Sequence, residues 1–567
     1  MDKKIKQKIR NWSLQNALKY QGKANQGAII GKLLSTHPEL KKELNMLSKE
    51  IIAIISEVNK LDADAQKKEL EKNAPELLEE KPKERKKGLK PLKDAEEGKV
   101  TVRMAPSPSG PLHIGHAYGA SINSEYARMY KGKCILRIED TNPENIYEPA
   151  YNLVPEDANW LTKNNISETI FQSDRLGFYY DHMEKLIAAG NAYICTCDPD
   201  EFREKIMKKK ACPCRELPVE EQGKRWDKMF GEYKPGEAVC RIKTDVAHKN
   251  PAMRDWPAMR INDHTHPRQG TKHRVWPLMN FSVAIDDHLM GLTHVMNGKE
   301  HADNAKRQKY IFDYFKWKQP VYINWGRINF EGMEISCSKT KQKIEYGEFK
   351  DWDDIRLPFL PALRRRGYQP EAFINFAVDM GLSLSDKTVS KDEFFKTINA
   401  FNKEIIDPIA NRYFFVDNPV EVTVKNAPKQ EVEIKLHPDD PKRGLRKFKC
   451  SDKFYLAKTD NEKLKAGKLV RLMDCLNFTK KGKELAFDSI DYKDYKEKGD
   501  RIIHWLPVST NLVDVEVLMP DNTTVKGFGE SSMSRLKIGN IVQLERFGFC
   551  RLDEIMGKKL KFWFAHR

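Results

Sequence analysis

The segment from Arg103 to His116, Arg-Met-Ala-Pro-Ser-Pro-Ser-Gly-Pro-Leu-His-Ile-Gly-His, constrains the fold of this chain more than any other stretch. A short β-branched strand, residues 99–103, runs into a rigid turn rich in proline and glycine, and a helix-like stretch follows. The N-terminus of such a helix offers free N–H groups and a positive dipole end to phosphates. Gly115 lets a flat ring approach the backbone, and His113 and His116 share one side of the first turn. The segment predicts a nucleotide site whose imidazole N–H groups stabilise a phosphorus centre gaining charge.

Strands and helices alternate beyond this segment. Residues 133–138 form a second apolar strand, so the region is typical of an α/β domain with a parallel sheet. The alternation pauses near residue 191 and resumes near 282–285, which indicates an insertion over about 191–281. Residues 350–415 have a helical pattern. From residue 416 to 567 apolar and polar residues alternate with a period of two, which predicts a region of all-β barrels.

Residues 1–78 predict a helical arm, because apolar residues recur at three- and four-residue spacing. These residues are Leu44, Leu47, Ile51, Ile54, Ile55, Val58 and Leu61. Residues 79–98 are highly charged and contain two prolines, which predicts a linker. Two interpretations of the arm are equally compatible with this pattern. It could bind RNA or a partner protein, or it could be an appended packing domain.

Composition excludes several classes of protein. The 567 residues are 40% hydrophobic and 32% charged, as in a folded multidomain protein rather than a fibrous or disordered one. Lys and Arg total 99 and Asp and Glu total 82, so the net charge is +17, which favours a polyanionic partner. No apolar run approaches the roughly 18 residues of a membrane span. The charged N-terminus lacks an apolar signal core, so we expect a cytoplasmic protein without a membrane partner.

The context of the histidine pair identifies a family. An isolated His-x-x-His more often caps a helix or packs in a core. Here Pro-Ser-Pro-Ser-Gly-Pro-Leu-His-Ile-Gly-His resembles the HIGH signature of class I aminoacyl-tRNA synthetases, in the glutamyl and glutaminyl subgroup. Further blocks agree in order, namely Arg137-Ile-Glu-Asp-Thr-Asn-Pro143, Asp287 to His301, Trp352-Asp-Asp-Ile-Arg-Leu-Pro and Leu363-Arg-Arg-Arg-Gly367. The all-β C-terminal region is similar to that of archaeal and eukaryotic-type glutamyl-tRNA synthetases.

The resemblance assigns the domains and the ATP site. It implies a Rossmann-like catalytic domain over 99–349 with an acceptor-binding insertion, a helical connecting region over 350–415 and an anticodon-binding region over 416–567. The second family signature, KMSKS, is degenerate here as Ser336-Cys-Ser-Lys-Thr340, in which Lys339 meets the ATP phosphates. Ser336 replaces the first lysine, and Lys341 is a candidate substitute. The implied ATP-binding residues are Pro106, His113, Gly115, His116, Ile328, Ser338 and Lys339, and the catalytic ones are His113, His116 and Lys339.

The resemblance also implies an amino-acid pocket. Arg103 and Ser107 enter it, and Glu139 faces the substrate ammonium; a guanidinium matches a carboxylate with two parallel hydrogen bonds. Two positions depart from the family. Met279 stands where a tyrosine often touches the substrate, and Asn297 stands where glutamyl members usually carry arginine. Because an amide side chain both donates and accepts, Asn297 suits a carboxylate or an amide, so glutamate and glutamine both stay open as substrates. Arg103 favours glutamate.

Four of the ten cysteines form a tight pattern. Cys195-Thr-Cys197 precedes Cys212-Pro-Cys214, and four thiolates on two short knuckles can enclose a tetrahedral Zn²⁺. A structural zinc site is expected, with four reduced buried cysteines as the alternative.

Three basic runs are candidates for contact with tRNA phosphates. They are residues 364–366, 442–449 and 479–483; Phe448, Phe454, Tyr455 and Phe478 lie in or near the last two and offer rings on which bases could stack. Each run is alternatively a solvated face, and each aromatic a core residue.

The resemblance implies ATP- and Mg²⁺-dependent ligation of L-glutamate to tRNA-Glu through a glutamyl-adenylate, by a monomer, with tRNA required for the first step. The alternatives are a glutaminyl-tRNA synthetase, a nondiscriminating glutamyl enzyme that also charges tRNA-Gln, and a nonenzymatic RNA-binding paralogue.

Overall fold

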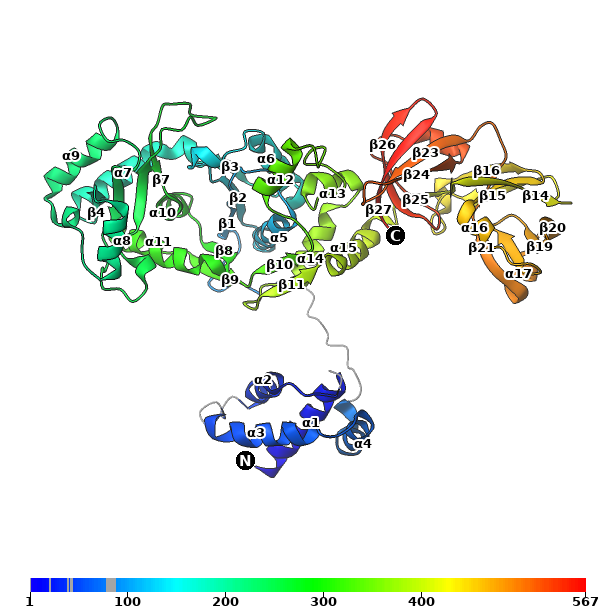
Figure 1. The fold of residues 1–567 in the computed structure, drawn as a ribbon, viewed down its shortest axis with the longest axis horizontal. Coiled ribbons are helices and arrows are strands. Elements are labelled where there is room, and N and C mark those ends of the chain that lie inside the picture. The colour runs from blue at the N-terminus through cyan, green and yellow to red at the C-terminus, as the bar shows by residue number, and fades with distance from the viewer. Residues whose placement is uncertain (1, 20–21, 38–39, 41–43, 78–87) are drawn as a thin grey trace. The chain divides into compact units, whose positions relative to one another are not determined.

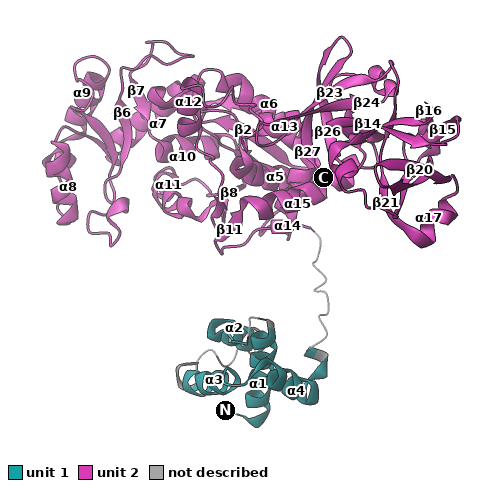
Figure 2. Cartoon of the chain, turned by 45° about the vertical axis from the view of Figure 1, so that its right-hand side comes forward, with its two compact units in different colours: residues 1–86 teal, residues 87–567 magenta. Residues whose placement is uncertain are grey.

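The structure is a computed structural model that describes residues 2–19, 22–37, 40, 44–77 and 88–567. The chain divides into two compact units, residues 1–86 and residues 87–567, coloured separately in Figure 2. Within the described ranges no helix is both long and apolar enough to cross a bilayer. The first nine residues of the predicted linker, 79–87, lie outside the described residues.

The first unit is a bundle of amphipathic helices. Its helices are α1 (Lys3–Lys19), α2 (Gln26–Thr36), α3 (Leu44–Val58) and α4 (Ala63–Asn73). Ile51, Ile55 and Val58 of the spaced apolar set are buried in its core. Arg10 on α1 ties the bundle together, because its guanidinium bonds Glu57 of α3 and Glu69 of α4.

The parallel sheet predicted after residue 99 is present. Its strands β1 (Thr101–Met104), β2 (Lys133–Ile138) and β3 (Glu168–Phe171) pair in parallel, and Arg103 lies opposite Ile135. A second parallel pair, β8 (His294–Gly298) and β9 (Val321–Trp325), runs beside β1. The N–H of Thr293, just before β8, donates to the carbonyl oxygen of Thr101 at the start of β1. Helices α5 (Ile114–Met129) and α6 (Ala150–Thr162) share the apolar core of this sheet. Helices α10 (Met279–Leu289) and α11 (Ala302–Phe315) share a core with the insertion instead (Figure 1). The carboxyl ends of these parallel strands therefore meet at one edge, where ligands bind in open α/β sheets.

The insertion is a separate antiparallel sheet. It contains α7 (Leu176–Ala188), β4 (Ala192–Cys195), α8 (Pro199–Met207), α9 (Val219–Met229), β5 (Val239–Ile242), β6 (Pro257–Ile261) and β7 (Val275–Pro277). The segment 282–285, where the α/β pattern was expected to resume, lies in helix α10 and not in a strand.

Residues 350–415 are mainly helical, as the pattern predicts, but they also contain strands. The segment after β9 comprises β10 (Ile328–Glu331), α12 (Cys337–Glu345), α13 (Leu360–Arg366), α14 (Pro370–Met380), β11 (Lys387–Ser390) and α15 (Lys391–Ile406). Strand β11 pairs in parallel with β10, which packs the helical region against the end of the catalytic region.

Two seven-stranded sheets form the C-terminal region. The first holds β12 (Asn411–Tyr413), β13 (Phe415–Asp417), β23 (Val513–Leu518), β24 (Thr524–Gly529), β25 (Ile541–Leu544), β26 (Gly548–Met556) and β27 (Lys559–His566). The second holds β14 (Pro419–Lys425), β17 (Lys453–Ala457), β18 (Leu469–Leu472), β19 (Asn477–Lys481), β20 (Glu484–Ser489), β21 (Gly499–Ile503) and β22 (Leu506–Pro507). A hairpin of β15 (Gln430–Lys435) and β16 (Leu445–Cys450) and the short helices α16 (Lys458–Glu462) and α17 (Tyr492–Lys498) complete the region.

The first of these sheets is a nearly closed barrel. Its two edge strands, β12 and β13, are separated only by Phe414, so one continuous segment supplies both edges. Val513, Val515 and Val517 point into its core, as the period-two pattern predicts. The predicted multidomain layout, with an α/β region, helical segments and C-terminal β-sheets, is confirmed.

Candidate active site

The histidine pair lies at the start of helix α5, with its rings stacked. His113 is the N-cap, and the two ring centroids are 3.8 Å apart. His113 Nδ1 accepts the Gly115 N–H at 3.1 Å, and His116 Nδ1 accepts the His113 N–H at 3.4 Å. Because an accepting Nδ1 carries no proton, both neutral rings have their proton on Nε2. The pair thus presents two Nε2–H donors beside the free N–H groups of a helix start.

Burial keeps both rings neutral. It holds the pKa of His113 well below its usual value, and the neighbouring His116 adds to this effect. Burial also lowers the pKa of His116 to about 4. At neutral pH the site therefore stabilises negative charge by hydrogen bonds and the helix dipole rather than by imidazolium charge.

Two glycines let the signature loops approach one another. A side-chain carbon on Gly115 would lie 2.9 Å from His113 Cε1, and one on Gly110 would lie 3.1 Å from Cys337 Sγ. Cys337 belongs to the Ser-Cys-Ser-Lys-Thr segment, and its Sγ lies 3.9 Å from Pro111 O. The structure therefore brings together the two motifs singled out in the sequence, which are more than 200 residues apart.

Lys339 lies in the first turn of helix α12. Ser336 caps this helix by accepting the Lys339 N–H at 3.5 Å, so the residue that replaces the first family lysine has a structural use. The Lys339 side chain is 70% exposed, and its Nζ lies 3.8 Å from Glu334 Oε2. Lys341 lies over the ring of Tyr147 at 5.5 Å and pairs with Glu345. The ammonium of Lys339 is therefore exposed and available to bind a phosphate.

A buried network of charges underlies the strand ends. Asp287 Oδ1 accepts hydrogen bonds from Arg103 Nε at 3.2 Å and from Arg137 Nη1 at 2.7 Å. Arg137 is fully buried, and its Nη2 donates to Glu139 Oε1 at 3.1 Å. The network joins Arg103, expected at the substrate carboxylate, to Glu139, expected at the substrate ammonium. Arg103 Nη1 also lies 3.4 Å from Asn297 Oδ1, and among the described residues nothing bonds its Nη2.

The remaining predicted site residues lie on the loops around this edge. Ser107 is exposed after β1, and Pro106 O accepts the Glu139 N–H at 3.0 Å, which joins the ends of β1 and β2. Met279 opens helix α10 and is 39% exposed. Ile328 begins β10, and Ser338 is exposed on α12 with its hydroxyl 3.2 Å from that of Ser336.

Sequence reasoning gave no role to Arg137 or Asp287, although both lie in the blocks that carry the resemblance. The signal was present in the strand Cys-Ile-Leu-Arg-Ile, where an arginine among apolar residues must find a buried carboxylate.

The four cysteines of the insertion converge. The Sγ atoms of Cys195, Cys197, Cys212 and Cys214 all lie within 4.8 Å of one another. Arg225 Nη1 lies 3.3 Å from Cys214 Sγ, so a cation and four sulfurs meet at one point. This donor set fits a tetrahedral Zn²⁺.

The basic and aromatic runs have mostly structural uses. Arg365 bonds Asp353 and Asp553, and the buried Arg366 bonds Phe564 O and Ala565 O, so these two residues of the candidate run 364–366 have structural partners. Phe448, Phe454 and Phe478 are buried in the core, so of the two alternatives for these aromatics the structure supports core packing over base stacking. Lys481 and Lys483 are exposed on the β19–β20 hairpin and fit a phosphate contact.

Comparison with known proteins agrees with this architecture. Residues 99–408 match the catalytic domain of tRNA synthetases class I (E and Q), and residues 410–494 and 502–553 match two anticodon-binding domains of the same group. Fold and site together therefore define a class I aminoacyl-tRNA synthetase.

Relatives of nearly the same length are known. The chain is 46% identical over 579 residues to the glutamate–tRNA ligase of Thermococcus kodakarensis, covering 99% of this chain and 100% of the relative. It is 44% identical to that of Methanobrevibacter smithii, with 98% of both chains covered. A solved glutamate–tRNA ligase from Elizabethkingia meningosepticum is 20% identical, with a TM-score of 0.40 over 55% of this chain and 70% of that one. The chain belongs to the glutamyl and glutaminyl (E and Q) family of class I tRNA synthetases.

Proposed function

We propose that this chain is a glutamate–tRNA ligase, which joins L-glutamate to tRNA-Glu at the expense of ATP. The observation that carries the proposal is the meeting of two motifs at one strand edge. The stacked His113 and His116 donors and the Lys339 loop adjoin there, and Arg103 lies on β1, the strand that leads into the His113 segment. Relatives at 44–46% identity over nearly the whole chain are named glutamate–tRNA ligases, which supports the same substrate.

In the first step the glutamate α-carboxylate attacks the α-phosphate of ATP, and pyrophosphate leaves. The phosphorus centre gains negative charge on its way to the transition state, and the two Nε2–H groups and the start of α5 are suited to stabilise it. Lys339 is suited to meet the departing phosphates, whose Mg²⁺ neutralises part of their charge. The adenine is expected near the backbone of Ile328, and Pro106 and Ser338 border the nucleotide.

The side chain of the substrate is recognised by charge. Asp287 holds Arg103 through Nε and Asn297 accepts a hydrogen bond from its Nη1, which leaves Nη2 to face a carboxylate. Glutamine would present a neutral amide to the same cation and leave part of its charge unpaired. A site with such a buried, unpaired group strongly disfavours that substrate. Glu139 and Ser107 take the ammonium and α-carboxylate end. Asn297 and Met279 complete the pocket.

In the second step a terminal adenosine hydroxyl of the tRNA takes the glutamyl group and AMP leaves. The C-terminal sheets are proposed to bind the anticodon of tRNA-Glu, with Lys481 and Lys483 on its phosphates. We expect a cytosolic enzyme that works as a monomer. We also propose a structural Zn²⁺ held by the four cysteines, which stabilises the insertion that meets the acceptor end.

The test is pyrophosphate exchange with ATP in the presence of tRNA-Glu. Exchange should depend on glutamate, and His116→Ala should slow it while tRNA binding, measured by filter retention, is unchanged. Exchange that glutamine supports better than glutamate would contradict the substrate assignment. Equal loss of exchange and of tRNA binding would contradict the role of His116.

A further inference from the structure

A buried carboxylate outside the predicted site holds the backbone just before His113. Asp157 lies on helix α6 and is 1% exposed, and its Oδ2 accepts the Leu112 N–H at 3.0 Å. Leu112 comes immediately before His113, the N-cap of α5. The carboxylate therefore reaches across 45 residues of sequence to the peptide unit from which the histidine pair begins.

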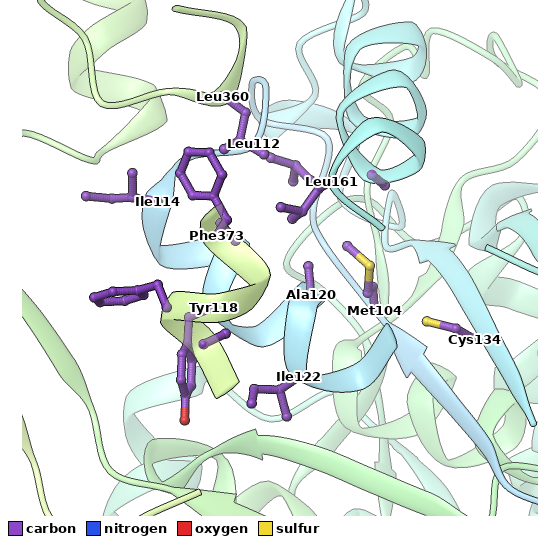
Figure 3. Close-up of a cluster of buried hydrophobic side chains, with 14 of the residues drawn as sticks. Met104, Leu112, Ile114, Tyr118, Ala120, Ile122, Cys134, Leu161, Leu360 and Phe373 are labelled. Atoms are coloured by element: carbon purple, nitrogen blue, oxygen red, sulfur yellow. The ribbon is translucent and has the colours of Figure 1, made fainter. Parts of the chain in front are cut away.

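The same backbone is fixed on its other side by the segment that precedes helix α13. Leu360 N–H donates to Leu112 O at 2.8 Å, and Ile114 N–H donates to Pro358 O at 3.2 Å. The ring of His113 meets the ring of Phe359 edge-on at 5.6 Å. Figure 3 shows Leu112 beside Leu360 in the apolar cluster between these elements. Asp157 thus supplies a third anchor, in addition to the two backbone bonds.

The chemistry of Asp157 indicates a purpose other than stability. Its carboxyl group is buried among apolar residues and has one neutral N–H donor, so holding a polar or ionised group there costs free energy. The charges that act on the Asp157 carboxyl, Arg364 on α13 and Glu156 on α6, are bonded to each other at 2.7 Å, so neither is dedicated to Asp157. An apolar side chain would suit the surroundings better, but it would leave the Leu112 N–H without an acceptor.

We propose that Asp157 is a positioning residue for adenylate formation: by holding the Leu112 amide it fixes His113 and His116 where their Nε2–H groups meet the α-phosphate. Because misplacement of such donors by about 1 Å costs on the order of a hundredfold in rate, the effect should fall on the chemical step. This inference rests on the proposed function, since it needs an adenylate-forming site at α5.

The test compares Asp157→Leu, which has similar size and no acceptor, with Asp157→Asn, which keeps one carbonyl oxygen for Leu112. Pyrophosphate exchange with tRNA present is measured at saturating and limiting glutamate. Asp157→Leu should lower kcat by about a hundredfold with little change in the KM for glutamate. Asp157→Asn should restore most of the rate. Thr162→Val is the matched control, because Thr162 is buried on the same helix and its hydroxyl donates to the backbone carbonyl of Ala158 within that helix.

The outcomes separate this inference from the proposed function. A wild-type chain without glutamate-dependent exchange would overturn the function itself. A wild-type kcat in Asp157→Leu, an Asn variant as slow as the Leu variant, or an equal loss in Thr162→Val would each overturn the positioning role alone. If Asp157→Leu fails to fold, Asp157→Ala carries the same comparison, because it too lacks the acceptor.

Discussion

Asp287 and Arg103 form a buried pair at the floor of the proposed glutamate pocket, with Asp287 Oδ1 accepting a hydrogen bond from Arg103 Nε at 3.2 Å. The same oxygen bonds Arg137, so one carboxylate orients two guanidinium groups. The bond through Nε orients the guanidinium of Arg103, and its Nη2, which no described residue bonds, remains for a ligand. Substrate recognition therefore depends on a residue that need not touch the substrate.

Removal of this carboxylate should be costly. Asp287→Ala leaves Arg103 and Arg137 buried without their shared partner, which should destabilise the chain by about 3–5 kcal/mol. In the protein that still folds, kcat/KM for glutamate should fall, because Arg103 is no longer oriented. Thermal unfolding and pyrophosphate exchange measure the two effects. Asp313→Ala, which removes an exposed partner of Lys309, is the control and should change stability by less than about 1 kcal/mol. Equal effects of the two variants would contradict the account.

Gly115 should tolerate no side chain. Gly115→Ala places a carbon 2.9 Å from the His113 ring, which must then move out of its stack with His116. We expect exchange to fall by about a hundredfold, because the donors lose their alignment. Gly177→Ala is the matched helical control, since a side chain there meets nothing within 4 Å. It should leave the rate unchanged and raise stability by up to about 1 kcal/mol. A fully active Gly115→Ala would show that the histidine geometry is not critical.

The sequence predicted the first strand, the turn and helix α5 because proline, glycine and histidine there act locally. It also predicted that the four cysteines converge, because the two residues of each Cys-x-Cys pair are close in sequence and stay close in the fold; whether they hold zinc stays a prediction. The segment 282–285 could not be assigned, because a short, mostly apolar run fits a buried strand and a buried helix equally well. The role of Asp157 could not be predicted from the sequence, for a different reason. Its partner lies 45 residues away, and nothing in the local pattern distinguishes a carboxylate bonded to a distant amide from one in water.

The ionisation of Asp157 should appear in the pH dependence of stability. Burial raises the pKa of Asp157 to about 7, and the Leu112 N–H and Arg364 offset this only in part. An aspartate in an unfolded chain titrates near 3.9, so between about pH 4 and pH 7 the folded chain holds the extra proton. Its contribution to stability is therefore present at low pH and is lost as pH rises through 7. The melting temperature of Asp157→Asn relative to wild type should rise between pH 5 and pH 8. A constant difference would contradict the shifted pKa.

The cysteine site should hold metal. We expect about one zinc per chain by elemental analysis, and a lower melting temperature after treatment with a strong chelator, because a structural zinc contributes to folding. Cys212→Ser should lose the metal and melt at a lower temperature. Cys550→Ser, which alters a buried cysteine outside the cluster, should keep it. A metal-free wild-type protein whose melting temperature is insensitive to zinc would show that the four thiols are simply reduced and packed.

The central claim is that this site joins glutamate to tRNA, and competition charging tests it most directly. Transcripts of tRNA-Glu and tRNA-Gln are each incubated with ATP and equal amounts of glutamate and glutamine, and the aminoacylated terminal adenosine is identified by mass spectrometry. Glutamyl-adenosine from tRNA-Glu is the predicted product, and glutamyl-adenosine from both transcripts would make the enzyme nondiscriminating. Glutaminyl-adenosine from tRNA-Gln, or no charged adenosine at all, would contradict the account.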